Sequence, residues 1–193
     1  MKGKSNIYRC IVVLLLMCCA PHLAQAQKFA VSTNALTWAN FGTINAEGSF
    51  IVSRHITLHA GGTANPWEIT TPTKYTIRNR QYGGYVGARY WPWHVYSEWW
   101  VGAKLQYKNF EQMGLMTTNL IKGDAAGAGV SAGYTFMLSR HFNIDLGLGV
   151  WGGSMFRYKE YLGTVANENE IAKQGPRGFF FLDNMIISFA YIF

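Results

Sequence analysis

Four charged residues, Glu47, Arg89, Lys104 and Asp145, are the strongest candidates for chemistry, because each lies in a segment where polar and apolar residues alternate. On a β-strand such residues share one face, opposite the apolar face. Two carboxylates beside a cation could act as a general acid and base, but nothing in the sequence marks a cleft open to a substrate. Because an unpaired buried charge costs several kcal/mol, we expect Glu47 and Asp145 to pair with Arg89 in the interior, with Lys104 nearby.

Histidines offer the other possible chemistry. His55 and His59 are four residues apart, which on a helix would let them share a metal ion. On a strand this spacing covers roughly 13 Å, so we expect both to be packed or rim residues. The sequence predicts no catalytic residue, no metal site and no cofactor.

Strands must position these residues, because period-two alternation runs through the chain and helical periodicity is weak, with only 165–173 able to form a turn or two. In 142–152, for example, Phe142, Ile144 and Leu146 alternate with Asn143 and Asp145. The expected strands are 28–38, 43–52, 55–64, 82–91, 97–109, 125–137, 142–152 and 184–193.

The apolar faces of these segments are broad and often end in aromatic residues. A water-soluble β-sandwich would also alternate, but strands of about ten residues match the ~9–11 of a membrane-spanning strand better than the usual ~5–6. We therefore expect an all-β fold, an eight-stranded antiparallel up-and-down transmembrane β-barrel. An interior of this size is filled by side chains, so no open pore is expected.

Link lengths predict the orientation. The links "SR" (53–54), "PWHVY" (92–96) and "LSRH" (138–141) are short, as periplasmic turns are, whereas 65–81, 110–124 and 153–183 are long, as external loops are. Both termini are then periplasmic. His55, His94 and His141 fall at the periplasmic end, which argues against an external site of the Ser-His-Asp type.

The first 26 residues resemble a secretory signal: Lys2, Lys4 and Arg9 precede the apolar run "CIVVLLLMCCA", and "AQA" (24–26) precedes the expected cleavage site. We expect residues 27–193 to form the outer-membrane domain. All three cysteines lie in the signal. The remaining segment has 14 basic and 10 acidic residues, a net charge of +4, which is too mild for a nucleic-acid interface.

Two aromatic groups have expected roles at the membrane. Tyr90, Trp91, Trp93, Trp99 and Trp100 flank a predicted periplasmic turn, where an interfacial aromatic girdle belongs; a carbohydrate-stacking platform is the alternative. Phe189, Tyr191 and Phe193 occupy alternate positions at the C-terminus. An aromatic final strand resembles the insertion signal that the barrel-assembly machinery recognises.

The long links are the expected contact surfaces. Lys74, Arg78 and Arg80 make 65–81 basic, with Glu68 as its only acid, so this loop could pair with lipopolysaccharide phosphates. The mixed-charge segment 157–183 is a candidate site for a surface protein partner.

Several segments resemble an uncharacterised family of small outer-membrane β-barrels from Gram-negative anaerobes, known as a domain of unknown function. They are "STNALTWA" (32–39), "LHAGGTANPWE" (58–68), "GARYW" (87–91) and "GAGVSAGYTFMLSRHFNID" (127–145). Ser32 stands where the family usually has Lys. The resemblance implies an outer-membrane location and a link to fimbrial or surface assembly, because such genes often lie near fimbrial genes. It implies no activity.

The expected function is therefore that of a non-enzymatic outer-membrane barrel with a packed lumen and a structural or surface-interaction role. A barrel that handles a lipid or small ligand is one alternative, and an outer-membrane enzyme is another.

Overall fold

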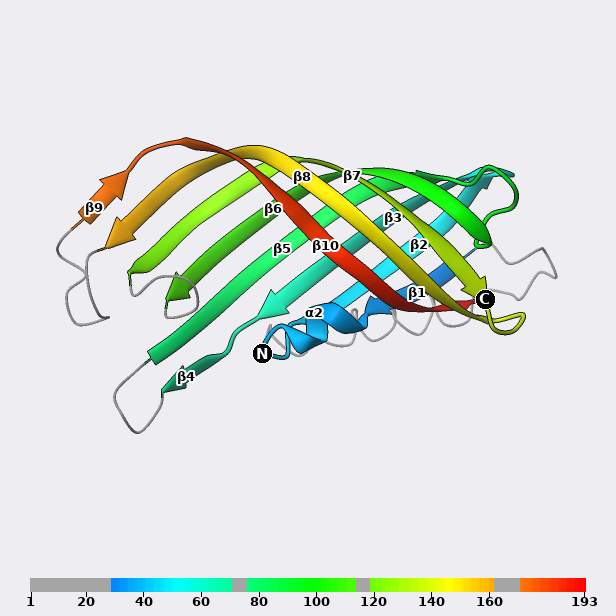
Figure 1. Cartoon of the computed structure of the whole chain (residues 1–193), viewed down its shortest axis with the longest axis horizontal. Coiled ribbons are helices and arrows are strands. Elements are labelled where there is room, and N and C mark those ends of the chain that lie inside the picture. The colour runs from blue at the N-terminus through cyan, green and yellow to red at the C-terminus, as the bar shows by residue number, and fades with distance from the viewer. Residues whose placement is uncertain (1–28, 71–75, 114–118, 162–170) are drawn as a thin grey trace, which may run out of the picture.

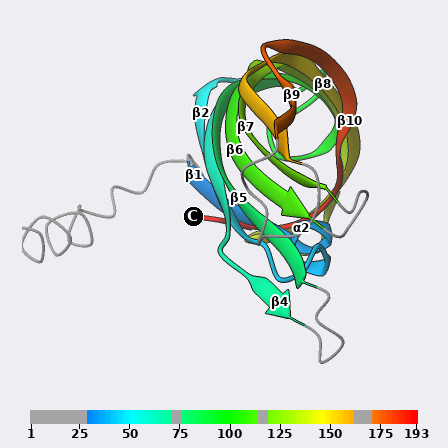
Figure 2. The ribbon, with the colours of Figure 1, turned by 90° about the vertical axis from the view of Figure 1, so that its left-hand side faces the viewer.

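The structure is a closed ring of eight antiparallel strands. The computed structural model describes residues 29–70, 76–113, 119–161 and 171–193. The strands of the ring pair in the order β1-β2-β3-β5-β6-β7-β8-β10, and β10 pairs again with β1 (Figures 1 and 2). The elements are β1 (Phe29–Asn34), α2 (Ala35–Ala39), β2 (Ile44–Ser53), β3 (Ile56–Asn65), β4 (Glu68–Thr70), β5 (Thr76–Tyr90), β6 (Glu98–Met113), β7 (Leu120–Met137), β8 (Phe142–Tyr161), β9 (Ile171–Gln174) and β10 (Arg177–Ile192).

The first and last strands close the ring. Ala30 lies opposite Ile192, and the register continues to Asn34 opposite Ser188. The backbone N–H of Phe193 donates to the carbonyl oxygen of Phe29 at 2.9 Å. Both ends of the ring-forming chain therefore meet at the end that carries the short links β2–β3, β5–β6 and β7–β8.

The strands extend further at the opposite end than the sequence predicts. The expected links 65–81, 110–124 and 153–183 are partly strand, because β5 begins at Thr76, β7 begins at Leu120, and β8 continues to Tyr161. These extensions are rich in polar residues and glycine, so they lack the alternation that marks a half-buried strand. Backbone pairing with the neighbouring strand stabilises these extensions instead; Glu111 on β6, for example, lies opposite Lys122 on β7.

The first strand is shorter than predicted. It ends at Asn34, and residues 35–38 of the expected strand lie in helix α2. The Asn34 side chain accepts a hydrogen bond from the N–H of Leu36 at 3.1 Å, which caps the helix. In the expected helical turn at 165–173, Ile171 begins strand β9 and residues 165–170 lie outside the described part.

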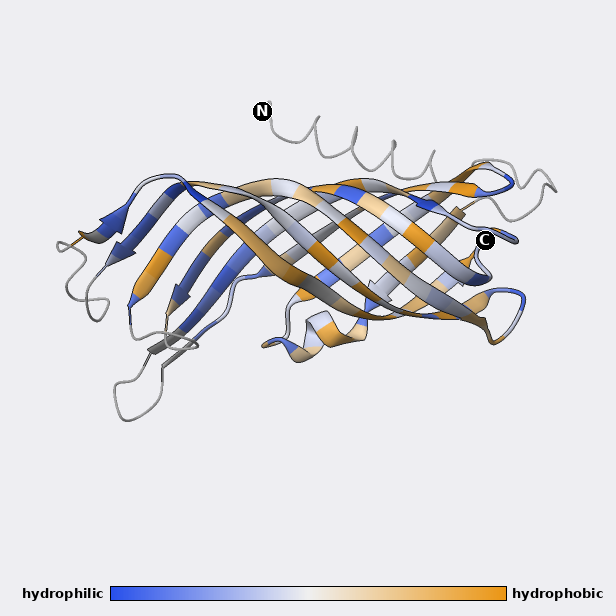
Figure 3. Cartoon of the chain, turned by 45° about the horizontal axis from the view of Figure 1, so that its top comes forward, coloured by the Kyte–Doolittle hydropathy of each residue, from blue (hydrophilic) through white to orange (hydrophobic). Residues whose placement is uncertain are grey.

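Polar side chains face into the ring and apolar side chains face out. Arg89 on β5 lies within ion-pair distance of Glu47 on β2 and Asp145 on β8, and these strands are not neighbours, so the contacts must cross the interior. On the opposite face of the same sheet, the apolar side chains of Leu58, Val86 and Leu105 are more than half exposed. In Figure 3 hydrophobic colour predominates in the half of the ring near the C-terminus, and hydrophilic colour predominates at the far strand ends.

The interior is filled at the end with the short links. Trp91, Tyr96 and Trp100 form a buried cluster with Ala30 and Ile192. Trp100 fits because two strands carry glycine beside it: a Cβ at Gly133 would lie 2.6 Å from Cζ2 of Trp100 and a Cβ at Gly147 would lie 3.1 Å from it. These buried side chains fill this end of the ring.

Deletion of Phe193 should weaken the closure of the ring. The deletion removes the hydrogen bond to Phe29 and the ring contacts of Phe193 with Phe29 and Tyr191, whose centroids are 5.9 and 4.9 Å away. We expect the free energy of unfolding in micelles to fall by about 1–2 kcal/mol, measured by urea titration. Leu138→Ala, an exposed change in the β7–β8 turn, is the control, and an equal effect of the two changes would contradict the prediction.

Candidate functional site

A cluster of opposite charges occupies the interior of the ring. Nη2 of Arg89 lies 2.8 Å from Oε1 of Glu47, and Nη1 lies 3.7 Å from Oδ2 of Asp145. All three side chains are 10% exposed or less. The structure thus brings together three of the four charged residues that the sequence selects, and they neutralise most of one another's charge.

Neutral and aromatic groups support this cluster. Tyr85 donates a hydrogen bond to Oε2 of Glu47 at 2.8 Å, and Thr135 donates one to Oδ1 of Asp145 at 2.6 Å. Cζ of Arg89 lies 4.6 Å from the ring centre of Trp100, a distance typical of a cation–π contact. The guanidinium is therefore held by two carboxylates and a ring on three different sides.

Lys104 completes the set of predicted residues. Its Nζ lies 4.8 Å from the ring centre of Tyr85, so it reaches the cluster through an aromatic ring that is itself bonded to Glu47. His59 also contacts Tyr85, with ring centroids 6.0 Å apart. His55 instead lies at the β2–β3 turn, where its Nδ1 is 2.9 Å from the carbonyl oxygen of Trp91, so the two histidines have separate surroundings.

The space beside the cluster is small. A polar cavity of about 50 Å³ is lined by Glu47, His59, Tyr85, Arg89 and Lys104, together with Ser32, Asn34, Asn45, Ser131, Ile186 and Ser188. This volume suits one or two water molecules and is far below the ~300–1,000 Å³ of an ordinary ligand pocket. Within the described residues no group of three or more His, Cys, Asp or Glu could hold a metal ion. The arrangement can stabilise and fill the ring, and it offers no room for an organic substrate.

Two of the five residues predicted for the aromatic girdle lie inside the ring. Trp91 is 0% exposed and Trp100 is 1% exposed, and Nε1 of Trp91 donates to Oγ1 of Thr57 at 3.1 Å. The prediction is wrong for these two because it treated a dense aromatic stretch as one surface. Alternation already separates the faces: next to each buried tryptophan, Tyr90 and Trp99 are exposed, as is Trp93 in the link.

The C-terminal aromatics share the outer face. Phe189, Tyr191 and Phe193 are all exposed, and Phe142 packs edge-on against Tyr191 at 5.8 Å. Tyr191 also contacts Phe193, at 4.9 Å, so exposed aromatic residues gather beside the closure between β1 and β10.

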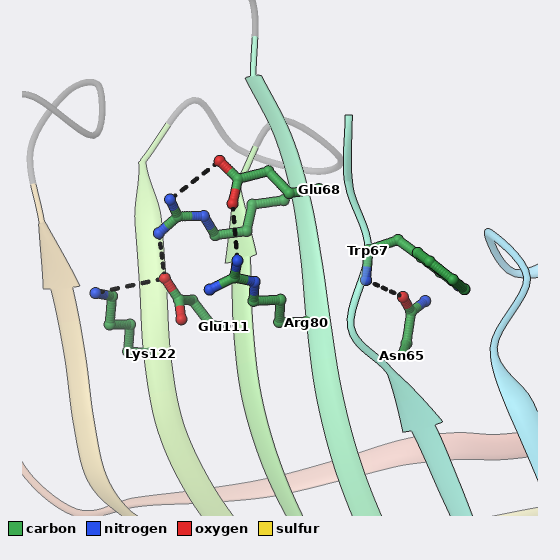
Figure 4. A network of polar contacts seen from close by, with 7 residues as sticks. Asn65, Trp67, Glu68, Arg80, Glu111 and Lys122 are labelled. Atoms are coloured by element: carbon green, nitrogen blue, oxygen red, sulfur yellow. Dashed lines mark hydrogen bonds and ion pairs between the residues drawn. The ribbon is translucent and has the colours of Figure 1, made fainter. Parts of the chain in front are cut away.

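A second charged network lies on the outer face at the far end of the strands, which we call the rim network (Figure 4). It consists of Glu68, Arg78, Arg80, Glu111 and Lys122, from four neighbouring strands. Arg78 pairs with Glu68 at 3.1 Å and with Glu111, Arg80 pairs with Glu68 at 3.3 Å, and Lys122 pairs with Glu111 at 3.4 Å. Three of these residues belong to the predicted basic loop 65–81. Lys74 of that loop lies outside the described residues.

A buried carboxylate, Asp124, lies on β7 between the rim network and the apolar part of the outer face. Asp124 accepts hydrogen bonds from Tyr107 and Asn109, both at 2.8 Å, and lies 3.5 Å from Nη1 of Arg157. Sequence reasoning missed Asp124 because it placed the residue in a loop. Asp124 is the last residue of the predicted loop 110–124, so it could have been found only by extending the expected strand 125–137 by one residue. Here the outer face changes from apolar to charged.

The segment 157–183 contributes mainly strand. Nζ of Lys173 on β9 lies 3.9 Å from Oε2 of Glu160 on β8, and Asn119 donates to Oε1 of Glu160 at 2.9 Å. Residues 162–170 lie outside the described part. The described portion is thus an extension of the ring wall. None of the described residues forms a helix long and apolar enough to cross a bilayer.

Arg89→Met should lower the free energy of unfolding by about 3–5 kcal/mol, because it leaves Glu47 and Asp145 buried without their cation. Urea unfolding in micelles measures the effect. The triple variant R89M/E47L/D145L should recover most of the loss, since no charge remains. Arg80→Met, which removes a half-exposed guanidinium from the rim network, should cost less than about 1 kcal/mol. Equal losses of unfolding free energy in R89M and R80M would contradict a structural role for the ion pairs of Arg89.

Acid should loosen the rim network. Partial burial opposes the charge of Glu111, but the hydrogen bond from Arg78 and the charge of Lys122 outweigh it and hold the pKa of Glu111 below its ordinary value. A lowered pKa stabilises the fold above the ordinary glutamate value near 4.5, and this stabilisation is lost as the pH falls through the lower, folded value.

We therefore expect hydrogen exchange at the paired ends of β5 and β6 to accelerate as the pH falls from 6 to 3, after correction for intrinsic rates. Glu111→Gln should reduce this pH dependence, whereas Glu160→Gln, on the β8 side, should leave it intact. An unchanged pH profile in Glu111→Gln would show that other carboxylates control this end.

Comparison with known proteins identifies a family. Searches of the curated proteins and of the solved structures give no match. The sequence does match a family described as "Protein of unknown function (DUF3575)", and the match covers residues 11–193. The ring of strands, the interior charges and the rim network all lie within the matched range. The chain therefore belongs to the DUF3575 family.

Proposed function

We propose that the protein is a non-enzymatic β-barrel of the bacterial outer membrane that presents its far strand ends for interaction at the cell surface. The observation that carries this proposal is the inverted polarity of the ring, with charges inside and exposed apolar side chains outside. A water-soluble ring would place its apolar side chains inward. An apolar outer face is what a membrane-spanning barrel requires, because lipid surrounds it.

The length of the apolar face supports the same proposal. On β8 the outward apolar residues begin at Phe142 and continue through Leu148 to Val150, and the strand becomes polar above Phe156. About ten residues of a tilted strand cross a bilayer. Exposed Trp93 and Trp99 at one border, and Tyr107 at the other, suit interfacial positions.

The proposed orientation places the short links and both termini in the periplasm, as in other outer-membrane barrels. The expected signal sequence at 1–26 would deliver the chain there, and Phe189, Tyr191 and Phe193 would serve recognition by the assembly machinery. The rim network then lies outside the cell. Its half-exposed Arg80 and the nearby, largely exposed Arg157 are placed to meet lipopolysaccharide phosphates.

The interior supports a role other than conduction. The pairs around Arg89 and the cluster of Trp91, Tyr96 and Trp100 lie toward the end with the short links, so we expect no continuous path for solutes. The polar far ends, in the segments 65–81 and 157–183, are the proposed surface for a protein partner, and the family resemblance suggests fimbrial or surface assembly as the setting.

The location is tested by fractionation. We expect the mature chain in the outer-membrane fraction, with a shift in gel mobility between unboiled and boiled samples, because a closed barrel resists detergent. Proteoliposomes should show no rapid solute entry. Deletion of Phe193 should lower the outer-membrane level while export across the inner membrane stays normal. A soluble product without a mobility shift would overturn the proposed location, and rapid swelling would overturn the packed interior.

A further inference from the structure

The wall of the ring is incomplete on one side. β1 ends at Asn34 and pairs with β10 only up to Ser188, whereas β10 pairs with β8 as far as Arg177 opposite Met155. Among the described residues, 177–187 of β10 therefore have a strand partner on one side only. We call this gap the seam; its second bank is α2, the turn at 40–43 and the start of β2 at Ile44, where the chain leaves the wall (Figure 1).

Near Ser188, the side chain of Asn34 and helix α2, which packs against β10, take the place of the missing strand. The Asn34 amide donates to the carbonyl oxygen of Met185 at 3.2 Å and accepts from the N–H of Ile187 at 3.3 Å. On the other bank Asn45 exchanges hydrogen bonds with the backbone of Asn34, at 2.7 and 2.9 Å. These two amides close the wall beside the charge cluster; from there toward Arg177, among the described residues, β10 has a strand partner on one side only.

Both banks of the seam are apolar and exposed. On β10, Phe180 is 73% exposed, Leu182 is 69% and Met185 is 60%. The second bank carries exposed Trp38, Phe41 and Ile44. Leu182 lies opposite Val150, an outward residue of the apolar face, so this part of the seam lies at a level that the proposed function places in the membrane.

An aromatic surface continues from the seam into the ring. Phe179 packs edge-on against the buried Trp151 with centroids 4.4 Å apart, and Phe181 stacks on Phe179 at 5.5 Å. Trp151 belongs to a buried cluster with Phe110, Ala125 and Tyr158. Phe181 lies on the same side of β10 as Phe179, yet it is 52% exposed. A half-exposed ring on this path is consistent with an unfilled entrance.

The cationic side chain of Arg177 lies where β10 begins, at the far end of this aromatic surface. Cζ of Arg177 lies 5.8 Å from the ring centre of Tyr158, and its side chain is exposed. The seam thus combines an apolar track with a positive charge at the polar end, which is the complement of an anionic amphiphile. Water that enters with the head group would also hydrate the unpaired backbone of β10, which bare hydrocarbon cannot do.

We propose that the seam binds an anionic amphiphile, with its acyl chain on Phe181, Phe179 and Trp151 and its anionic head group at Arg177. The proposal rests on the proposed membrane location. A carboxylate and a phosphate head group share the required chemistry, and a fatty acid and a phospholipid could each supply it.

The test uses the full mature chain purified from outer membranes in a nonionic detergent, with 9,10-dibromostearic acid as the probe. Bromine quenches tryptophan fluorescence at contact range. We expect saturable quenching in the wild type and loss of that saturable part in Trp151→Phe, which keeps an aromatic ring. Trp93→Phe, at an exposed position near the other end, should keep it. Saturable quenching that is the same in Trp151→Phe and the wild type would overturn the proposed site.

The head group is tested separately. Arg177→Gln should weaken binding of the bromo-acid about tenfold, the effect of losing one charge-assisted pair, and should leave binding of its methyl ester unchanged. Arg54→Gln, which makes the same charge change in the β2–β3 turn, should alter neither. A dibromo-phosphatidylglycerol probe distinguishes a phospholipid from a free acid. Equal loss of acid and ester binding in Arg177→Gln would overturn the role of the cation.

The same preparation separates the possible failures. A heat-dependent mobility shift without saturable quenching would overturn the seam proposal and leave the membrane location standing. A soluble chain without the shift would overturn both. A doubled native mass with no bound probe would assign the edge of β10 to a second strand from another copy, and would likewise overturn the amphiphile.

Discussion

The ion pairs of Arg89 are the interaction on which the interior depends. One guanidinium on β5 contacts carboxylates on β2 and β8 and a ring on β6, so it joins β5 to two strands, β2 and β8, that do not pair with it. Charges in this position are costly unless every partner is present. In return they select one register: a slip of one residue on any of the three charged strands would turn a charge toward the outer face.

The strand order and the two faces could be predicted from sequence because period-two alternation is a direct consequence of strand geometry. Glu47, Arg89 and Asp145 follow from the same rule, since only the inner face tolerates them. The extensions of β5 to β8 could not be predicted this way, because residues such as Asn109 and Asp124 are polar on the outer face as well. Their strand conformation depends on the neighbouring strand, which a local pattern does not contain.

Other failures have local causes. Helix α2 follows from a capping hydrogen bond of Asn34, but asparagine is common in turns and the alternation of the preceding segment continues through Trp38. The dense aromatic composition of 90–100 suggests a surface position for Trp91 and Trp100. Alternation places both inside, because Trp91 comes two residues after Arg89 and Trp100 comes four residues before Lys104. In the first case the hydrogen bond of one residue decides the structure. In the second, the position of each tryptophan in the alternation decides it. In neither case does the overall composition of the segment decide it. The seam follows from the short β1, and its existence therefore could not be predicted either.

The pairing of β1 with β10 has a consequence for the order of folding. The contact between Asn34 and Ile187 joins residues 153 positions apart, and loop-closure entropy opposes such a contact until the intervening chain is ordered. The hairpins β2–β3, β5–β6 and β7–β8 have short links and can form locally. Closure must come after them, and it requires β10, the last strand of the ring. A chain that lacks β10 cannot complete the hydrogen bonding of β1 and β8, so this strand acts as a check that the whole ring has been synthesised.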